Sequence, residues 1–267
     1  MIATADSRPL AAARTRWALV ALLFVLAAVC WWVTVDRMDG MDAGPGTDVG
    51  GFGWFVGVWV VMMAAMMFPS VAPTVALYSR MAKSREPLGP LAFSAGYLIS
   101  WAGAGVVAYG LFVLGRELLG DELAWDGAGQ WVAAGVLALA AAYEVTPLKD
   151  ACLGRCRSPL GFLLGNWRNG VGGALEMGIK HGAWCIGCCW ALMAALFALG
   201  VMSIAWMAFV AGLIALEKLL PWERVATYGT AAILLVLAIV LVAAPDAIPG
   251  LTVPGGDEGG SMQMMMR

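Results

Sequence analysis

The chain has 267 residues, of which 61% are hydrophobic and 13% are charged, and its formal net charge at pH 7 is −2. Its mean hydropathy of +0.82 lies far above that of soluble domains, and several apolar runs approach the ~20 residues that span a bilayer. This composition excludes a soluble globular domain and predicts an integral membrane protein.

Seven apolar runs predict seven transmembrane helices. In chain order they cover residues 17–35, 53–78, 92–114, 128–147, 174–200, 202–220 and 225–244. None of the runs shows the alternation of an outer-membrane strand, so we expect an all-α helical bundle. The first run is long for a secretion signal and no small-residue cleavage site follows it, which favours an anchor helix. We divide the chain into an N-terminal anchor with its outer loop (1–52), a membrane core (53–221), and a last helix with a flexible outer tail (222–267).

Lys and Arg are distributed unevenly between the two expected sides of the membrane. If the N-terminus is cytoplasmic, the inner side collects 13 of the 16 basic residues. Positively charged loops stay in the cytoplasm, so this orientation is the predicted one. Seven spans then place the C-terminus outside.

The expected outer segments are acidic and contain methionine. The first outer loop, 36–51, has four Asp and two Met residues. The tail ends on four further methionines, Met262, Met264, Met265 and Met266. Thioethers are soft ligands that suit Cu(I) and do not form disulfides in oxidising surroundings. A frayed terminus that tolerates methionine is the other interpretation.

The second run contains the motif WVVMMAAMMFPSVAP. Met62 and Met66 are one helical turn apart, as are Met63 and Met67, so two methionine ladders are expected on adjacent faces. Paired methionines can pass Cu(I) through an apolar region, and flexible methionine side chains also fill irregular cores. The two prolines of the motif are expected to break the helix and to free backbone carbonyls.

Five of the six cysteines are expected at the inner side, where a reducing compartment keeps thiols available as ligands. Cys152 and Cys156 follow the fourth run, and three more lie in the motif HGAWCIGCCW at 181–190. At 100° per residue, one helix stripe about 120° wide holds a thioether, an imidazole and three thiols: Met177, His181, Cys185, Cys188 and Cys189. These are ligand types of a soft metal site, and plain packing of cysteine is the alternative. Gly178 and Gly182 would let another helix approach this stripe closely.

Two acidic residues are expected at the inner ends of apolar runs. Glu144 has Lys149 nearby in the sequence, and Glu217 has Lys218. Ionisable groups at membrane depth are costly, so both carboxylates are functional candidates. An ion pair that holds two helices together is the equally weighted alternative.

Several chemistries have no motif in this chain. A single histidine excludes bis-histidine haem ligation within the chain, and there is no phosphate-binding loop and no H-E-x-x-H motif. The sequence favours a binding protein over an enzyme and leaves a redox enzyme open.

Four motifs resemble a bacterial family of predicted metal-binding integral membrane proteins: MMAAMMFPS, YEVTPLKDACLGRC, GIKHGAWCIGCCWALMAALFALGVMSIAWM and LEKLLP. The resemblance covers about residues 53–221 and implies a metal-related role at the bacterial cytoplasmic (inner) membrane, with copper as the usual metal. Residue by residue, it carries over Met63, Met67, Pro69, Glu144, Pro147, Lys149, Cys152, Cys156, His181, Cys185, Cys188, Cys189, Trp190, Met202, Trp206, Met207, Glu217 and Lys218.

We therefore predict a multi-pass membrane protein that handles Cu(I) by uptake, delivery or storage, with zinc as the alternative metal. Outer methionines collect the ion, the methionine ladders lie along its route, and inner thiolates hold it. Two other functions stay open: a membrane thiol-disulfide oxidoreductase, and an assembly subunit that delivers a metal to a partner. The expected partners are the lipid bilayer, a metal ion and a membrane or periplasmic metalloprotein, with no nucleic acid.

Overall fold

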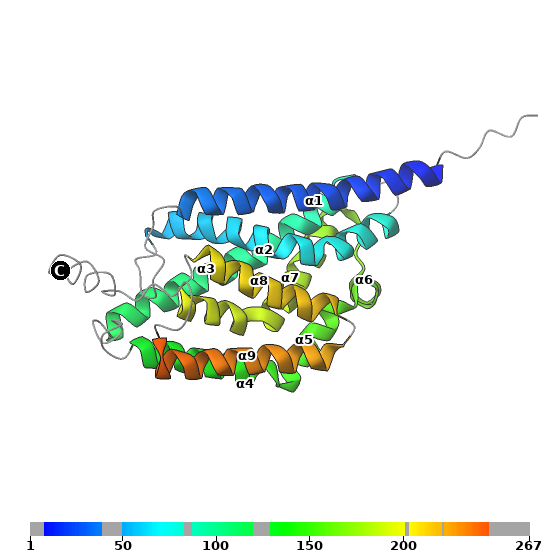
Figure 1. Cartoon of the computed structure of the whole chain (residues 1–267). Coiled ribbons are helices and arrows are strands. Elements are labelled where there is room, and N and C mark those ends of the chain that lie inside the picture. Colours follow the sequence, from blue (N-terminus) through cyan, green and yellow to red (C-terminus); the bar gives the residue numbers. More distant parts are fainter. Residues whose placement is uncertain are drawn as a thin grey trace, which may run out of the picture.

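The computed structural model describes residues 8–38, 50–82, 87–119, 129–200, 203–220 and 222–245. These residues form helices and no strand, which confirms the all-α prediction (Figure 1). The helices are α1 (Arg8–Met38), α2 (Phe52–Met81), α3 (Gly89–Leu119), α4 (Gln130–Glu144), α5 (Pro147–Arg157), α6 (Pro159–Asn166), α7 (Gly170–Leu199), α8 (Ile204–Leu219) and α9 (Glu223–Ala243). In Figure 1, α1 and α2 lie on one side of the bundle and α4 and α9 on the opposite side.

Among the described residues, five helices are long and apolar enough to cross a membrane: α1, α2, α3, α7 and α9. Helices α4 and α5 pass the same criterion only as a pair, which would make six spans. Helix α8 has 16 residues, fewer than the ~20 that an upright span needs. The seven-span count and the orientation therefore stay predictions.

The expected fourth span, 128–147, corresponds to α4, and a second helix, α5, follows directly after it. Helix α4 ends at Glu144, and α5 leaves it at an angle of 67°. The break has a local cause, because Pro147 lacks an N–H and is favoured at the first position of a new helix. The side chain of Thr146 caps that helix by accepting a hydrogen bond from the backbone N–H of Lys149 at 3.3 Å.

Helix α2, in contrast, does not break at its prolines. It runs from Phe52 to Met81 with Pro69 and Pro73 inside it, so the predicted break is wrong. A proline within a helix costs about 3 kcal/mol, because it removes one hydrogen bond and crowds the preceding turn. Val71 and Ala72, between the two prolines, are buried, and tertiary packing of this kind outweighs a local propensity.

Helices α3 and α7 pack closely through glycine. A Cβ atom on Gly178 would lie less than 3 Å from the backbone of Phe93, and one on Gly182 would lie 2.7 Å from the Cβ of Ser100. Gly96 of α3 faces the backbone of α7 in the same way. These contacts confirm the prediction that Gly178 and Gly182 admit a neighbouring helix, since only glycine leaves room for the two backbones.

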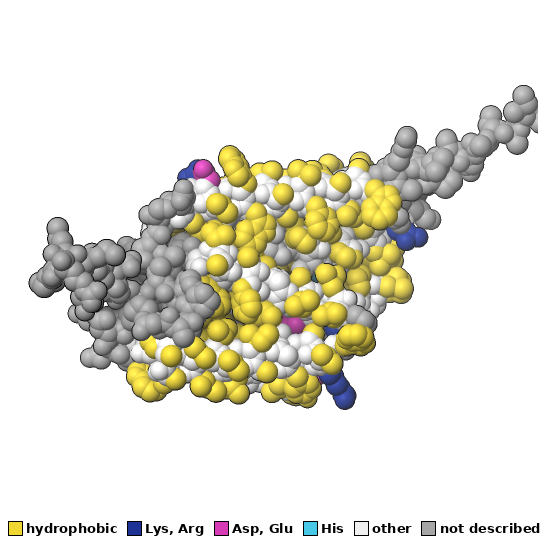
Figure 2. Space-filling model, in the orientation of Figure 1, with side chains coloured by type: hydrophobic (Ala, Val, Ile, Leu, Met, Phe, Trp, Pro, Cys, Tyr) yellow, Lys and Arg dark blue, Asp and Glu magenta, His cyan; other side chains and the backbone are white. Residues whose placement is uncertain are grey.

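Large apolar side chains also cover the outside of the bundle. Hydrophobic side chains are spread over the whole described face in Figure 2, with few charged ones among them. Exposed large apolar residues include Trp32, Leu111, Leu139 and Val225. Soluble monomers rarely expose contiguous apolar surface on this scale. The exterior is therefore compatible with a protein embedded in a membrane.

Candidate metal centre

Three cysteine thiols meet inside the bundle. The Sγ atoms of Cys156, Cys185 and Cys188 all lie within 4.8 Å of one another, and those of Cys156 and Cys188 are 3.7 Å apart. Three sulfurs placed about 2.3 Å from one ion in a trigonal plane are about 4 Å apart. The spacing of this group, which we call the thiol triad, fits a single thiolate-bound metal ion.

Two of these thiols are placed by the regular geometry of α7. The helix is continuous from Gly170 to Leu199, so residues three apart lie on one face. Cys185 and Cys188 are both buried on that face, as the stripe predicted from the sequence requires. Their burial keeps water away from any ion that they hold.

The third thiol reaches α7 because the chain bends between α4 and α5 and because α5 is held against α7 and α8 by side-chain contacts. Arg157 donates hydrogen bonds to the carbonyl oxygens of Glu217, at 3.0 Å, and Leu220, which ties the end of α5 to the end of α8. The guanidinium of Arg155 lies 3.8 Å from the ring centroid of Trp184 on α7, a cation–π contact. These contacts hold α5 against α7 and α8, and Cys156 lies between the two arginines in the sequence.

Two polar groups converge on the sulfur of Cys185. Lys218 of α8 donates from Nζ at 3.1 Å, and the hydroxyl of Tyr97 from α3 lies 3.1 Å away. An ammonium group can only donate, so the sulfur is its acceptor. A neighbouring cation favours the thiolate, which is the form that binds metals. Sequence reasoning missed Tyr97, which no motif marks, and noted Lys218 as the basic residue next to Glu217 without placing it beside the cysteines.

The other two inner cysteines lie beside the triad without joining it. Cys189 is buried, and its thiol donates to the backbone oxygen of Cys185 at 2.9 Å. Cys152 is also buried, and its Sγ would lie 2.8 Å from a Cβ atom on Gly187. The structure thus gathers three of the five thiols that the sequence proposed, and a ligand role for Cys152 and Cys189 stays a prediction.

Met177 and His181 extend the same face of α7 beyond Cys185, and both are buried. The ring of His181 packs edge-on against Phe162, with 4.8 Å between the ring centroids. Its Nδ1 has no hydrogen-bond partner among the described residues. A buried imidazole nitrogen without a partner is energetically costly and is available to a ligand, so this residue stays a candidate beside the triad.

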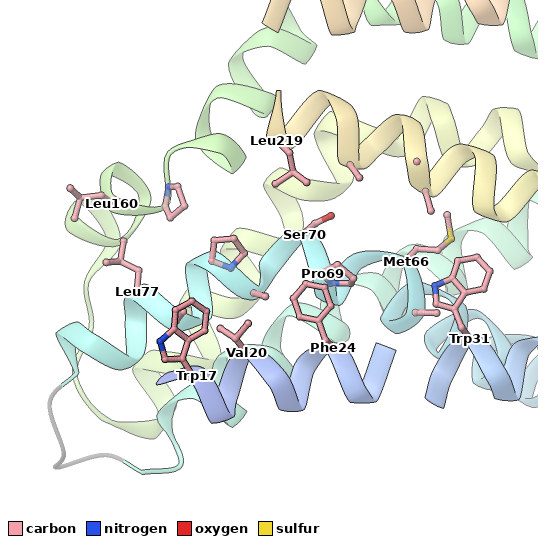
Figure 3. A pocket seen from close by; sticks show the side chains of 18 of the residues that line it. Trp17, Val20, Phe24, Trp31, Met66, Pro69, Ser70, Leu77, Leu160 and Leu219 are labelled. Carbon is pink, nitrogen blue, oxygen red and sulfur yellow. The ribbon is translucent and has the colours of Figure 1, made fainter. Parts of the chain in front are cut away.

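The methionine ladders are part of the hydrophobic core. Met62, Met63, Met66 and Met67 are all buried within α2. Met66 also lines a cavity of about 920 Å³ between α1, α2, α6 and α8, and Figure 3 shows it near Trp31 of α1. The observed positions suit packing, and the proposed role of the ladders as a metal route stays a prediction.

The two acidic candidates share one lysine. Nζ of Lys149 binds both carboxylate oxygens of Glu217, at 2.9 and 2.8 Å, and also pairs with Glu144. All three side chains are buried, and they join α4, α5 and α8. The ion pair between helices, which the sequence left open as the alternative, is therefore present, and Lys149 rather than the adjacent Lys218 is the cation that binds Glu217. Lys218 faces Cys185 instead.

Several predicted residues lie outside the described part of the chain. They are the tail methionines Met262, Met264, Met265 and Met266, most of the first outer loop, and Met202. The structure therefore bears on the inner and central candidates alone.

Fold and site together define a class: an all-helical, apolar bundle with a buried cysteine cluster that is able to hold a metal ion. A family model described as a copper chaperone (PpoB2) matches residues 56–241, which is more than half of the chain. The chain therefore belongs to this copper chaperone family. The matched segment contains the whole thiol triad. No curated protein and no solved structure matches the chain.

Proposed function

We propose that this protein is a membrane-embedded chaperone that holds Cu(I) at the thiol triad and hands it to a partner metalloprotein. The observation that carries the proposal is the convergence of Cys156, Cys185 and Cys188 within 4.8 Å, in a member of a copper chaperone family.

The chemistry of the triad supports Cu(I) over other metals. Thiolates are soft ligands, and geometry and ligand type, more than raw affinity, decide which soft metal a site takes. A structural zinc site normally has four protein ligands, whereas the triad offers three. Zinc would need a fourth donor, for which His181 and Cys189 on the same face of α7 are the candidates.

The route of the ion follows from the distribution of ligand types. Outer methionines, including those of the tail, collect Cu(I) in an oxidising compartment, where thiols would form disulfides. Met62, Met63, Met66 and Met67 then lie along the path, and the thiolates bind more tightly than thioethers. This difference in affinity favours movement of the ion from the outer side of the bacterial inner membrane to the triad, where it stays bound until a recipient protein takes it. The five long apolar helices support the membrane setting.

On this inward route the recipient is a membrane metalloprotein that reaches the inner side, whereas a periplasmic metalloprotein would require the ion to move in the opposite direction. A chaperone has to release its ion, and exchange between thiols is the simplest way to do so. Cys189 and Cys152 lie beside the triad and are available to take over a ligand position during transfer. Co-purification of a copper protein with this chain is the expected sign of such a partner.

A second candidate function rests on one distance. The Sγ atoms of Cys156 and Cys188, 3.7 Å apart, are close enough to form a disulfide after a small movement, as a thiol oxidoreductase requires. Titration of free thiols in the protein after equilibration with glutathione buffers distinguishes this function. In a chaperone, Cys156 and Cys188 stay reduced at cytosolic redox potentials. In an oxidoreductase, the two thiols are converted into a disulfide, and back, at redox potentials close to the cytosolic one.

The decisive experiment is elemental analysis of the protein purified in detergent under reducing, copper-replete conditions. Wild type is compared with a variant in which Cys156, Cys185 and Cys188 are all changed to Ser, and with Cys30→Ser as the matched control, since Cys30 lies on α1. We expect near-stoichiometric copper in wild type and in the control, and almost none in the triple variant. Full copper in the triple variant would exclude the triad as the site.

A further inference from the structure

Lys218 directs its positive charge at the thiol triad. Its Nζ lies 3.1 Å from Sγ of Cys185. The carboxylate next to it in the sequence, Glu217, is bound on both oxygens by Lys149. The ammonium of Lys218 therefore interacts with the sulfur of Cys185 and not with the neighbouring carboxylate of Glu217.

A fixed cation at this position changes which ions the site accepts. Three thiolates and the ammonium of Lys218 together carry two negative charges in a buried site, so a monovalent ion leaves one of them and a divalent ion leaves none. Charge balance by itself thus favours a divalent ion, because unbalanced charge is costly where water is excluded. Lys218 opposes this preference, because its ammonium already offsets one thiolate and repels a divalent ion twice as strongly as a monovalent one.

We propose that Lys218 is a specificity-determining residue that shifts the selectivity of the thiol triad toward monovalent and away from divalent soft metal ions. The inference rests on the proposed function and extends it, since it names a charge that favours Cu(I) relative to Zn(II) at a site of three thiolates. Lys218 acts on the metal through charge, beside Cys185, and is not itself a ligand.

The size of the effect follows from Coulomb's law. The two kinds of ion differ by one unit charge, and the ammonium of Lys218 lies 3.1 Å from one of the sulfurs that would hold them. At the effective dielectric constant of a protein interior, one such interaction changes an equilibrium constant on the order of a hundredfold. Relaxation of the site reduces this, so removing the charge should change the selectivity by about ten- to a hundredfold.

Tyr97 provides an internal comparison. Its hydroxyl is as close to the same sulfur, at 3.1 Å, as the ammonium of Lys218. It carries no charge at neutral pH, so removing it takes away a polar contact alone. Tyr97→Phe should change the affinities for monovalent and divalent ions by the same factor, whereas Lys218→Gln should change them by different factors.

Ag(I) and Cd(II) are the appropriate probes, because they have the same electron configuration, are both soft, undergo no redox change here, and differ by one charge. Dissociation constants for each ion are measured by chelator competition on the full chain in detergent, under reducing conditions. The proteins compared are wild type, Lys218→Gln, Lys218→Arg, Tyr97→Phe and Lys180→Gln. Lys180 is the matched control, because it is a lysine on the same helix as Cys185 whose ammonium pairs with Glu176 at 3.0 Å on the surface of α7 instead of with the triad.

The expected result is a ratio of Ag(I) to Cd(II) affinity that falls about ten- to a hundredfold in Lys218→Gln, returns to the wild-type value in Lys218→Arg, and stays unchanged in Tyr97→Phe and Lys180→Gln. Should Lys218→Gln not fold, Lys218→Met keeps the apolar stem and carries the same measurement. An unchanged ratio in the neutral variants that still bind both ions would overturn the inference and leave the proposed function intact. Failure of wild type to bind either ion would overturn both.

Discussion

The thiol triad and the methionine ladders offer two sets of soft sulfur ligands that differ in what surrounds them. Cys185 and Cys188 of the triad and the four ladder methionines are buried near the middle of a 30-residue helix, in α7 and α2 respectively. The triad draws on two helices and receives Lys218 and Tyr97 from two more. The ladders come from α2 alone and lie in the hydrophobic core. Ligand type and burial are therefore not enough to define a site; convergence of polar and ligating groups from several elements is the distinguishing feature.

The sharpest test of the comparison uses two thiols of one helix. Cys156→Ser should remove nearly all bound copper, because it takes one of three ligands from the triad. Cys152→Ser, one helical turn earlier on α5, should leave the copper content close to that of wild type. Copper per protein is measured by elemental analysis. Equal loss in both variants would mean that the whole inner cysteine cluster holds the metal.

The second largest effect concerns the scaffold of the triad. Lys149→Met leaves Glu144 and Glu217 buried without their cation, and breaking a buried ion pair costs about 3–5 kcal/mol in the free energy of unfolding. We expect a large drop in the unfolding temperature in detergent. The control Lys180→Met removes a half-exposed pair with Glu176, which is worth about 1 kcal/mol or less. A Lys149→Met variant as stable as the control would contradict the structural role of the lysine.

A smaller effect is expected on the methionine side of the comparison. Replacing Met63 and Met67 together by Leu keeps volume and apolarity, so each change should cost less than about 1.5 kcal/mol. Equilibrium copper content should stay at the wild-type value, and only the rate of loading in vesicles should fall, if the ladders are the route. A loss of bound copper at equilibrium would mean that the ladder is a second copper-binding site, which would contradict the difference proposed between the ladders and the triad.

The smallest effect is expected from the tail. Deletion of residues 262–267 removes Met262, Met264, Met265 and Met266, which we propose as the first ligands that copper meets. Loading of the triad should slow at low copper concentration and be unchanged at high concentration. Time courses of copper uptake by vesicles at the two concentrations test this. Slower loading at both concentrations would place the tail on the route itself.

Local periodicity predicted what depends on one helix alone. The stripe of Met177, His181, Cys185, Cys188 and Cys189 follows from 100° per residue, and the structure buries all five. The close approach of another helix at Gly178 and Gly182 likewise needs only the absence of side chains. The match of residues 56–241 to a copper chaperone family agrees with the metal chemistry that these residues suggested.

Contacts between helices were decided by the tertiary structure. That Cys156 and not Cys152 joins the thiol triad depends on how α5 is placed after the 67° bend, and that Glu217 reaches Lys149 depends on how α8 packs against α5. The persistence of α2 through Pro69 and Pro73 depends on packing that overrides a local penalty. Tyr97 lies 88 positions before Cys185, and Lys218 lies 33 positions after it. A sequence pattern that repeats every 3.6 residues describes one face of one helix, and it contains no information on which distant side chain that face will meet.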